Sequence, residues 1–251
     1  KGNFDDCQNL VKSMFSDKEF SNQINMSGVN SINWARIIAQ SVYYFYCYFL
    51  AEDDNQPINF SVPTGNFGDV YAGYLAKKLG LPINKLIVAT NQNDILHRAI
   101  SKGKYEAEHV SETISPSMDI QIASNFERLI YDLNNHDSSQ TLDDMKNIKQ
   151  NGKYTIDVEK LKKINQDFLS ARISEQETLD VIKNIYEKFN MVLDPHTAIG
   201  YGAFDKHDLK GNNIVLATAH PCKFPDAILK AINLKSDLPD ELKFILDEKE
   251  N

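Results

Sequence analysis

A short apolar strand pattern, a glycine-containing turn and a helical pattern follow one another in the first half of the chain. Residues 58–62 have the pattern of a buried strand, and the turn 63–68 contains two glycines and a proline. Residues 69–79 have helical spacing, Gly80 is placed to end that helix, and residues 86–90 form the next strand pattern. This unit has the length of a right-handed crossover between parallel strands. The sequence therefore predicts an α/β fold, with a twisted parallel sheet and helices on both faces.

Further helices, one more strand and a polar stretch are expected along the chain. The helices are expected at residues 5–20, 32–50, 94–102, 124–133, 175–189, 197–206 and 224–232, and the third strand at 214–218. Ser31 is placed to cap the second of these helices. We expect a large α/β domain (57–133 and 190–251), a mainly helical insertion (134–189) and a further part at residues 1–56.

Charge and cysteine content argue against several classes of function. The 251 residues carry a net charge of −8, whereas nucleic acids and anionic membranes require a basic surface. No apolar run in the sequence is long enough to span a membrane. Cys7, Cys47 and Cys222 are far apart and odd in number, which argues against a disulfide framework or zinc site and fits a reducing cytoplasm. The chain starts at Lys1 without Met, so we expect an N-terminal portion to be absent from it.

The turn after residue 62 has the composition of an anion-binding site. Ligands of open parallel sheets bind at the carboxyl ends of strands, and this turn follows such an end. Glycines at 65 and 68 allow close backbone approach, and the N–H groups at the start of the next helix attract phosphate. The turn lacks the Gly-Lys-Ser/Thr ending of a Walker A loop and the spacing of a dinucleotide fingerprint. On spacing alone, an ordinary tight strand-to-helix turn explains it equally well.

Seven segments resemble, in order, motifs of the threonine synthase family in its long bacterial and fungal form. They cover nearly the whole chain and include the turn SVPTGNFGD. The segments are 2–8, 30–36, 61–69, 89–94, 115–120, 194–198 and 218–224. The resemblance implies the tryptophan synthase β-like fold, with residues 1–56 belonging to its smaller domain. It also implies an enzyme that uses pyridoxal 5'-phosphate (PLP) to convert O-phospho-L-homoserine and water to L-threonine and phosphate.

The resemblance further implies which residues contact the cofactor. The phosphate would be held by Gly65, Asn66, Phe67, Gly68 and Asp69. Thr218 would hydrogen-bond the pyridine nitrogen, and a neutral hydroxyl there would leave that nitrogen largely unprotonated. A threonine that only stabilises a turn at the end of a strand is the alternative.

Substrate contacts are expected from one helix start and from loops that follow strands. The residues concerned are Asn30, Ser31, Asn33, Arg36, Asn91, Asp94, Ser115 and Asp119. Arg36 suits a bidentate contact to a phosphate, whereas helix capping or a surface ion pair would also account for several of the set. For His196 and His220 we expect structural hydrogen bonds rather than acid–base roles.

The lysine that binds the cofactor is the main departure from the family. It lies in a motif of the FKD type, and no lysine from Lys1 to Lys249 has that context. We therefore expect neither a catalytic residue nor a metal site in this chain, which alone would be inactive. Two other functions stay open, a phospho-lyase that releases 2-oxobutyrate and a non-catalytic α/β module that binds a phosphorylated ligand. The sequence leaves monomer and homodimer undecided.

Overall fold

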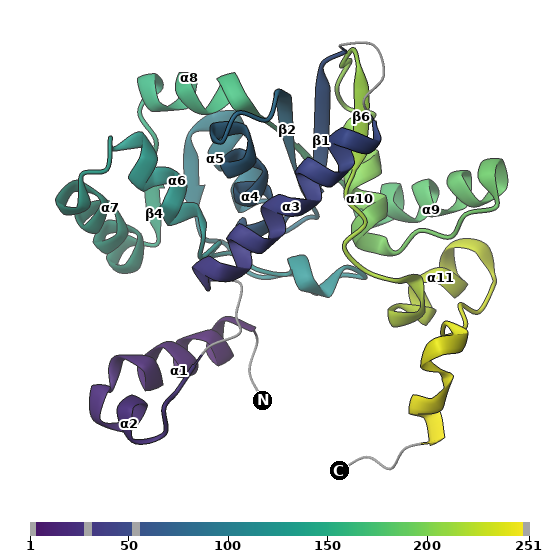
Figure 1. Ribbon diagram of the computed structural model, residues 1–251, viewed down its shortest axis with the longest axis horizontal. Helices are drawn as coiled ribbons and strands as arrows, with labels where there is room; N and C mark the ends of the chain where they lie inside the picture. Colours follow the sequence, from purple (N-terminus) through teal and green to yellow (C-terminus); the bar gives the residue numbers. More distant parts are fainter. Residues whose placement is uncertain (1–3, 28–31, 52–55, 248–251) are drawn as a thin grey trace.

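The computed structural model describes residues 4–27, 32–51 and 56–247, and a four-stranded sheet lies at its centre (Figure 1). The strands are β1 (Ile58–Pro63), β2 (Ile83–Thr90), β5 (Phe168–Arg172) and β6 (Asn212–Val215), in the order β5-β2-β1-β6. All three pairings are parallel. β1 is central and buried along its whole length. The predicted α/β fold with a parallel sheet is therefore confirmed.

Helices surround this sheet and form most of the connections between its strands (Figure 1). The α-helices are α1 (Phe4–Ser16), α2 (Lys18–Gln23), α3 (Trp34–Leu50), α4 (Gly68–Lys78), α5 (Ile95–Lys102), α6 (Phe126–Leu133), α7 (Ser138–Asn151), α8 (Val158–Asp167), α9 (Glu175–Phe189), α10 (Pro195–Phe204) and α11 (Pro225–Ile232). The 3-10 turns are η1 (Pro116–Met118), η2 (Pro221–Lys223) and η3 (Asp240–Asp247). A separate antiparallel pair is formed by β3 (Lys104–Glu106) and β4 (Lys153–Thr155).

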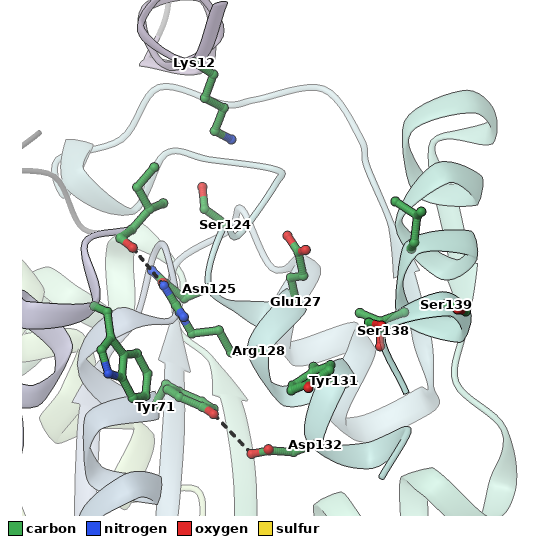
Figure 2. A pocket seen from close by; sticks show the side chains of 14 residues that line it. Lys12, Tyr71, Ser124, Asn125, Glu127, Arg128, Tyr131, Asp132, Ser138 and Ser139 are labelled. Carbon is green, nitrogen blue, oxygen red and sulfur yellow. Dashed lines mark hydrogen bonds between the residues drawn. The ribbon is translucent and has the colours of Figure 1, made fainter. Parts of the chain in front are cut away.

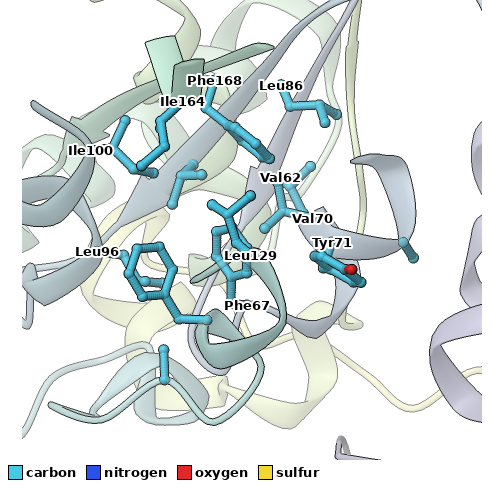
Figure 3. Close-up of a cluster of buried hydrophobic side chains, with 14 of the residues drawn as sticks. Val62, Phe67, Val70, Tyr71, Leu86, Leu96, Ile100, Leu129, Ile164 and Phe168 are labelled. Carbon is cyan, nitrogen blue, oxygen red and sulfur yellow. The ribbon is translucent and has the colours of Figure 1, made fainter. Parts of the chain in front are cut away.

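The two faces of the sheet pack against different helices because successive strand residues point to opposite sides. Leu86 and Val88 of β2 lie in the main core, which also holds side chains of α3, α4, α5 and α6 (Figure 3). Ile87 and Ala89 point to the other face, where they pack with residues of α10. Helices α9 and α11 pack onto α10 in a third cluster. The sheet is therefore a middle layer between α3–α6 on one side and α9–α11 on the other.

Two predicted helix starts differ from the structure because of capping. The helix expected at 5–20 is two helices, since Asp17 accepts a hydrogen bond from Phe20 N at 3.0 Å and begins α2. Helix α3 begins after Asn33, whose side chain accepts from Ala35 N at 2.9 Å. The predicted cap at Ser31 is therefore wrong, and Asn33 takes that role.

The third predicted strand, 214–218, ends earlier in the structure. β6 ends at Val215, and Leu216 N makes a last ladder bond to Ser61 O of β1 at 3.0 Å. The next ladder position on β1 is Pro63, which has no N–H to donate. Thr218 therefore lies beyond the strand, in the connection to α11.

The segment 134–189 is mainly helical but also contributes to the main sheet. It holds α7, α8 and α9, and its strand β5 pairs with β2 from Phe168 opposite Leu86 to Arg172 opposite Thr90. Strand β5 was not predicted from the sequence because it is short, has no alternating burial and lies between two helical patterns. The expectation of a separate insertion thus fails for residues 168–172, which are part of the sheet.

Candidate functional site

The loop between β1 and α4 is fixed on both sides at the carboxyl edge of the sheet. Thr64 N donates to Ala89 O of β2 at 2.8 Å, and Thr64 Oγ1 donates to Val62 O at 2.6 Å. Asn66 O accepts from the backbone N and from Nδ2 of Asn125, each at 3.1 Å. The chain therefore enters α4 along a path set by β2 and by the start of α6.

Two residues of this loop have little freedom to change. A Cβ on Gly65 would lie 2.7 Å from Ser117 O, so a larger residue does not fit without movement of the backbone. Phe67 has a φ of 65°, in the left-handed region that is costly for a residue with a side chain. Its ring is buried and packs against Phe126 and Phe168, with centroid distances of 5.2 and 5.8 Å. This packing holds Phe67 in its strained conformation.

A small hollow of about 130 Å³ lies at the start of α4. It is lined by Arg36 and Gln40 of α3 and by residues 63–69. Phe67 is the N-cap residue of α4 and provides no side-chain cap for the first N–H groups of the helix. Free N–H groups and the positive end of the helix dipole attract an anion, and Arg36 adds a full positive charge. The hollow therefore has the chemistry of a phosphate site.

Asp69 lies in the first turn of α4 and borders the same hollow. Tyr44 of α3 donates its hydroxyl to Asp69 O at 2.8 Å and lies 3.3 Å from Asp69 Oδ1. Burial raises the pKa of Asp69 to about 6, against the Tyr44 hydrogen bond and the charge of Arg36, which lower it. Burial also raises the pKa of Tyr44, so its phenol stays protonated and donates. The Asp69 carboxyl group therefore titrates close to neutral pH, next to the proposed anion.

Three side chains that build this hollow were not predicted from the sequence. Gln40 lines it, Tyr44 bonds Asp69, and Asn125 bonds Asn66. The first two could have been found, since Arg36, Gln40 and Tyr44 are spaced by four and share one face of a helix. Asn125 has no such signal, because it reaches the loop from a distant part of the chain.

The other predicted segments lie at the same edge of the sheet because all four strands run in one direction. The loop after β2 contains Asn91 and Asp94, and the segment after β6 contains Thr218. Since β1 lies between β2 and β6, the anion hollow is flanked by both segments. The topology therefore gathers the predicted site residues at one edge.

Asn91, Ser115 and Asp119 bond one another. Asn91 Nδ2 donates to Ser115 Oγ at 2.9 Å and to Asp119 Oδ1 at 2.8 Å. Asp119 Oδ1 also accepts from Thr113 Oγ1 at 2.7 Å and from Asn93 Nδ2 at 2.9 Å. These polar atoms are thus engaged in joining the loop after β2 to the segment 111–119. Thr113 and Asn93 belong to this network and were not predicted as site residues.

The remaining predicted substrate residues have structural partners or lie outside the description. Asp94 Oδ1 accepts from Arg98 Nε at 2.8 Å, and Asp94 Oδ2 lies 3.9 Å from Arg172 Nε. The side chain of Asn33 caps α3. Asn30 and Ser31 lie outside the residues that the structure describes.

Thr218 belongs to residues 217–224, which we call the 217–224 segment. The side chain of Thr218 is exposed, and His220 Nδ1 accepts from Cys222 N at 3.2 Å within the segment. At its end, the ring of Phe224 packs against His196, with a centroid distance of 4.8 Å. His196 Nδ1 lies 3.1 Å from Asp194 Oδ1. Both histidines therefore make the structural hydrogen bonds that the sequence analysis expected.

A larger hollow of about 930 Å³ lies between α1, α3, α4, α6 and α7 (Figure 2). Its cations are Lys12 of α1 and Arg128 of α6. Arg128 donates from Nε to Asn125 Oδ1 at 3.0 Å and from Nη2 to Ile32 O at 2.8 Å. The guanidinium also lies over the Trp34 ring, 5.0 Å from its centroid. The smaller hollow lies at the start of α4, where the first N–H groups lack a side-chain cap, so it is the better candidate for the anion site.

Metal-binding clusters and membrane-spanning helices are absent from the described residues. Within residues 4–27, 32–51 and 56–247, no group of three or more His, Cys, Asp or Glu side chains is placed to hold a metal ion. In the same ranges, no helix has the length and apolar character needed to cross a membrane.

Comparisons with known proteins agree with the resemblance in the sequence. A family model described as "Threonine synthase, C-terminal" matches residues 197–251. Threonine synthase of Saccharomyces cerevisiae is 46% identical over 270 residues, which cover 96% of this chain and 52% of the yeast protein. Threonine synthase of Pseudomonas aeruginosa is 43% identical over 100% of this chain and 54% of its own length.

The solved structures give the same result. A PLP-bound threonine synthase from Brucella melitensis matches with a TM-score of 0.93 and 47% identity, covering 100% of this chain and 54% of that one. The chain thus spans about half the length of the relatives it matches. Since the matches extend over the whole fold and include the C-terminal family model, the chain belongs to the threonine synthase family.

Proposed function

We propose that this chain forms part of a PLP-dependent threonine synthase, a lyase that converts O-phospho-L-homoserine and water to L-threonine and phosphate. One observation carries the proposal, which is the hollow formed by residues 63–69 and Arg36 at the carboxyl edge of the sheet. Gly65 keeps the loop in this position, because a Cβ there would lie 2.7 Å from Ser117 O and force the loop to move. Relatives named threonine synthase, similar along nearly the whole chain, support the assignment.

In this proposal the 63–69 loop binds the cofactor phosphate and thereby fixes one end of PLP. The first N–H groups of α4 and the guanidinium of Arg36 supply the positive potential. Asp69 holds a proton when the phosphate is present, since an ionised carboxylate next to a phosphate dianion would be repelled. PLP, when bound, supplies an electron sink for carbanions of the substrate.

The segments on either side of the hollow would orient the pyridine ring of the cofactor and the substrate. The Thr218 hydroxyl would contact the pyridine nitrogen of bound PLP, and as a neutral group it would not hold a proton on that nitrogen. The hydrogen-bonded set of Asn91, Ser115 and Asp119 keeps the loop after β2 in place beside the substrate. Direct substrate contacts from Asn30, Ser31, Asn33 and Asp94 remain predictions from the resemblance.

The lysine that attaches PLP is proposed to come from the part of the family that this chain does not match, because no lysine here lies in the expected motif. We also place the protein in the cytoplasm, since Cys7, Cys47 and Cys222 are free thiols. Both points concern the whole protein and are tested with it.

Product analysis tests the proposal. The full-length protein, saturated with PLP, is given O-phospho-L-homoserine, and L-threonine, 2-oxobutyrate and phosphate are measured. We expect one L-threonine per phosphate, together with the visible absorbance of bound PLP. Phosphate released with 2-oxobutyrate would identify a phospho-lyase instead. Absence of both PLP absorbance and product would favour the non-catalytic binding module.

A further inference from the structure

Helix α10 connects the two segments that are proposed to hold the cofactor. Ser61 Oγ of β1 donates to Gly200 O of α10 at 2.6 Å. A Cβ on Gly200 would lie 2.9 Å from Val215 Cγ1 and 3.2 Å from Pro63, so the helix packs directly onto the ends of β1 and β6. Because α10 leads into a strand that is parallel to β1, its first residue lies toward the carboxyl edge of the sheet. The start of α10 is therefore near the cofactor loops.

The start of α10 holds a buried carboxylate and imidazole. Asp194 is 1% exposed and caps the helix, accepting from His196 N at 2.8 Å and from the backbone and hydroxyl of Thr197. Burial opposes ionisation of Asp194, but hydrogen bonds from His196 and Thr197 outweigh it and lower the pKa. Because a carboxylate only accepts, His196 Nδ1 carries the proton and donates to Asp194 Oδ1 at 3.1 Å. The imidazole, 3% exposed, is thus held in one orientation.

The free face of this imidazole supports the 217–224 segment. The Phe224 ring lies 4.8 Å from the His196 ring at an interplanar angle of 51°. The segment leaves the sheet after Leu216, and its own hydrogen bonds, from Cys222, Lys223 and Phe224, are internal to it. Among the described residues, the segment is attached at Leu216, at the His196–Phe224 contact and through α11, where Phe224 O accepts from the buried Ile228 N at 3.1 Å. His196 Nε2 is buried and makes no hydrogen bond among the described residues, so the ring acts through its shape and its bond to Asp194.

We propose that His196 is a positioning residue that acts on the pyridine nitrogen of the cofactor through Phe224 and Thr218. Asp194 orients the imidazole, the imidazole sets the position of Phe224, and Phe224 fixes the segment on which Thr218 meets the nitrogen. The same helix is bonded to β1 through Gly200, so α10 sets the distance between the phosphate loop and Thr218. The inference rests on the proposed function, because it requires PLP to be the ligand.

The test compares two cofactors in the full-length protein. PLP and its 1-deaza analogue, in which a C–H replaces the ring nitrogen, share the aldehyde and the phosphate. Their affinity ratio therefore reports the contact to the nitrogen alone. We expect the natural protein to bind PLP about tenfold more tightly than the analogue, because one hydrogen bond contributes about that much to affinity. Thr218→Val should bring the ratio close to one and serves as the reference.

Two variants then address the proposed chain of contacts. His196→Asn keeps an N–H that can reach Asp194 but removes the ring edge from Phe224, and Phe224→Leu removes the other ring while keeping apolar bulk. Each should lower PLP affinity several-fold and leave the affinity for the 1-deaza analogue nearly unchanged, and the double variant should be no worse than either single one. Leu229→Ala, on the exposed side of α11, is the matched control and should leave the ratio unchanged.

The outcomes are distinguishable. Equal losses of affinity for both cofactors, or an unchanged ratio in either ring variant, would overturn the positioning role while leaving the proposed function intact. A natural protein that binds PLP without preferring it over the analogue would also overturn the role. If the natural protein binds neither cofactor, the proposed function fails and the inference fails with it. Since Phe224→Leu tests the same contact from the other side, a His196 variant that does not fold still leaves a decisive measurement.

Discussion

The 63–69 loop and the 217–224 segment lie at the same sheet edge but are held in different ways. The loop is bonded to β2 and α6, and its Phe67 ring is part of the main core. The 217–224 segment bonds chiefly within itself and is held at its end by Phe224, whose ring packs on His196 and whose carbonyl accepts from Ile228 N of α11. The phosphate end of the cofactor would thus meet a rigid surface, and the ring nitrogen a more loosely attached one.

The difference separates folding from binding. Loss of packing in the 63–69 loop disturbs the core and the anion hollow together, so stability and cofactor affinity should fall together. A change in the exposed side chain of Thr218 disturbs no core contact, so only affinity should fall. Four substitutions test this contrast in the full-length protein, in decreasing order of their expected effect on stability.

Phe67→Ala should have the largest effect. It removes a fully buried ring from the cluster with Phe126 and Phe168, while alanine keeps the strain of the left-handed backbone. We expect unfolding free energy to fall by about 3–5 kcal/mol in urea titrations, together with loss of PLP binding. Phe189→Ala is the control, since that ring is 56% exposed and should cost less than about 1 kcal/mol. Equal effects of the two would contradict a core role for Phe67.

Gly65→Ala should have the next largest effect. The new Cβ would lie 2.7 Å from Ser117 O, so the loop or the η1 turn must shift. We expect a loss of about 1–3 kcal/mol in unfolding free energy and a clear loss of PLP affinity, measured by absorbance titration. Gly202→Ala is matched to it, because a Cβ there meets its nearest neighbour at an ordinary 3.4 Å. A Gly65 variant that binds PLP as well as the Gly202 variant does would show that the 63–69 loop does not bind the PLP phosphate.

Asp69→Asn should change how stability depends on pH. Its folded pKa of about 6 lies above the usual 3.8, so the folded protein binds the proton more tightly than the unfolded chain. This group therefore stabilises the fold at low pH, and its contribution is lost as pH rises from about 4 to about 6. Asparagine does not ionise, so Asp69→Asn should abolish this loss of stability between about pH 4 and pH 6. It should raise the free energy of unfolding at pH 7 by on the order of 2 kcal/mol.

The same group should affect anion binding. As Asp69 ionises, it repels a phosphate, so natural affinity for PLP should weaken with pH above about 6 more steeply than in the Asn variant. Asp208→Asn, at an exposed position, controls for the change in net charge. Parallel pH profiles of the natural protein and the Asp69 variant would show that this carboxyl does not face the anion.

Local patterns in the sequence predicted the parallel sheet and the position of the 63–69 turn well. The strand–turn–helix order around residues 58–79 reflects contacts within that stretch, and the structure forms it with β1 and α4 almost as expected. The left-handed conformation of Phe67 was not predicted, because it depends on rings from α6 and β5 that are distant in sequence. Strand β5 was not predicted for a related reason, since only its pairing with β2 identifies it as a strand.

The roles of polar residues were harder to predict than their location. Substrate contacts by Asn91, Ser115 and Asp119 stay a prediction, and the structure shows that these side chains also bond one another. One sequence cannot separate these cases, because an amide or hydroxyl suits either partner. The raised pKa of Asp69 is likewise set by burial under α3, which no local pattern reveals.

Thr218→Val should have the smallest effect on stability and is the sharpest test of the contrast. The side chain is exposed and makes no hydrogen bond among the residues that the structure describes. The free energy of unfolding, measured by thermal denaturation, should therefore change by less than about 0.5 kcal/mol. PLP affinity should still fall by about tenfold if the hydroxyl meets the ring nitrogen. Thr155→Val, at an exposed position in β4, should change neither quantity. A stability loss at Thr218 comparable to that of Gly65→Ala would show that the two segments are equally rigid, and the separation of folding from binding would not hold.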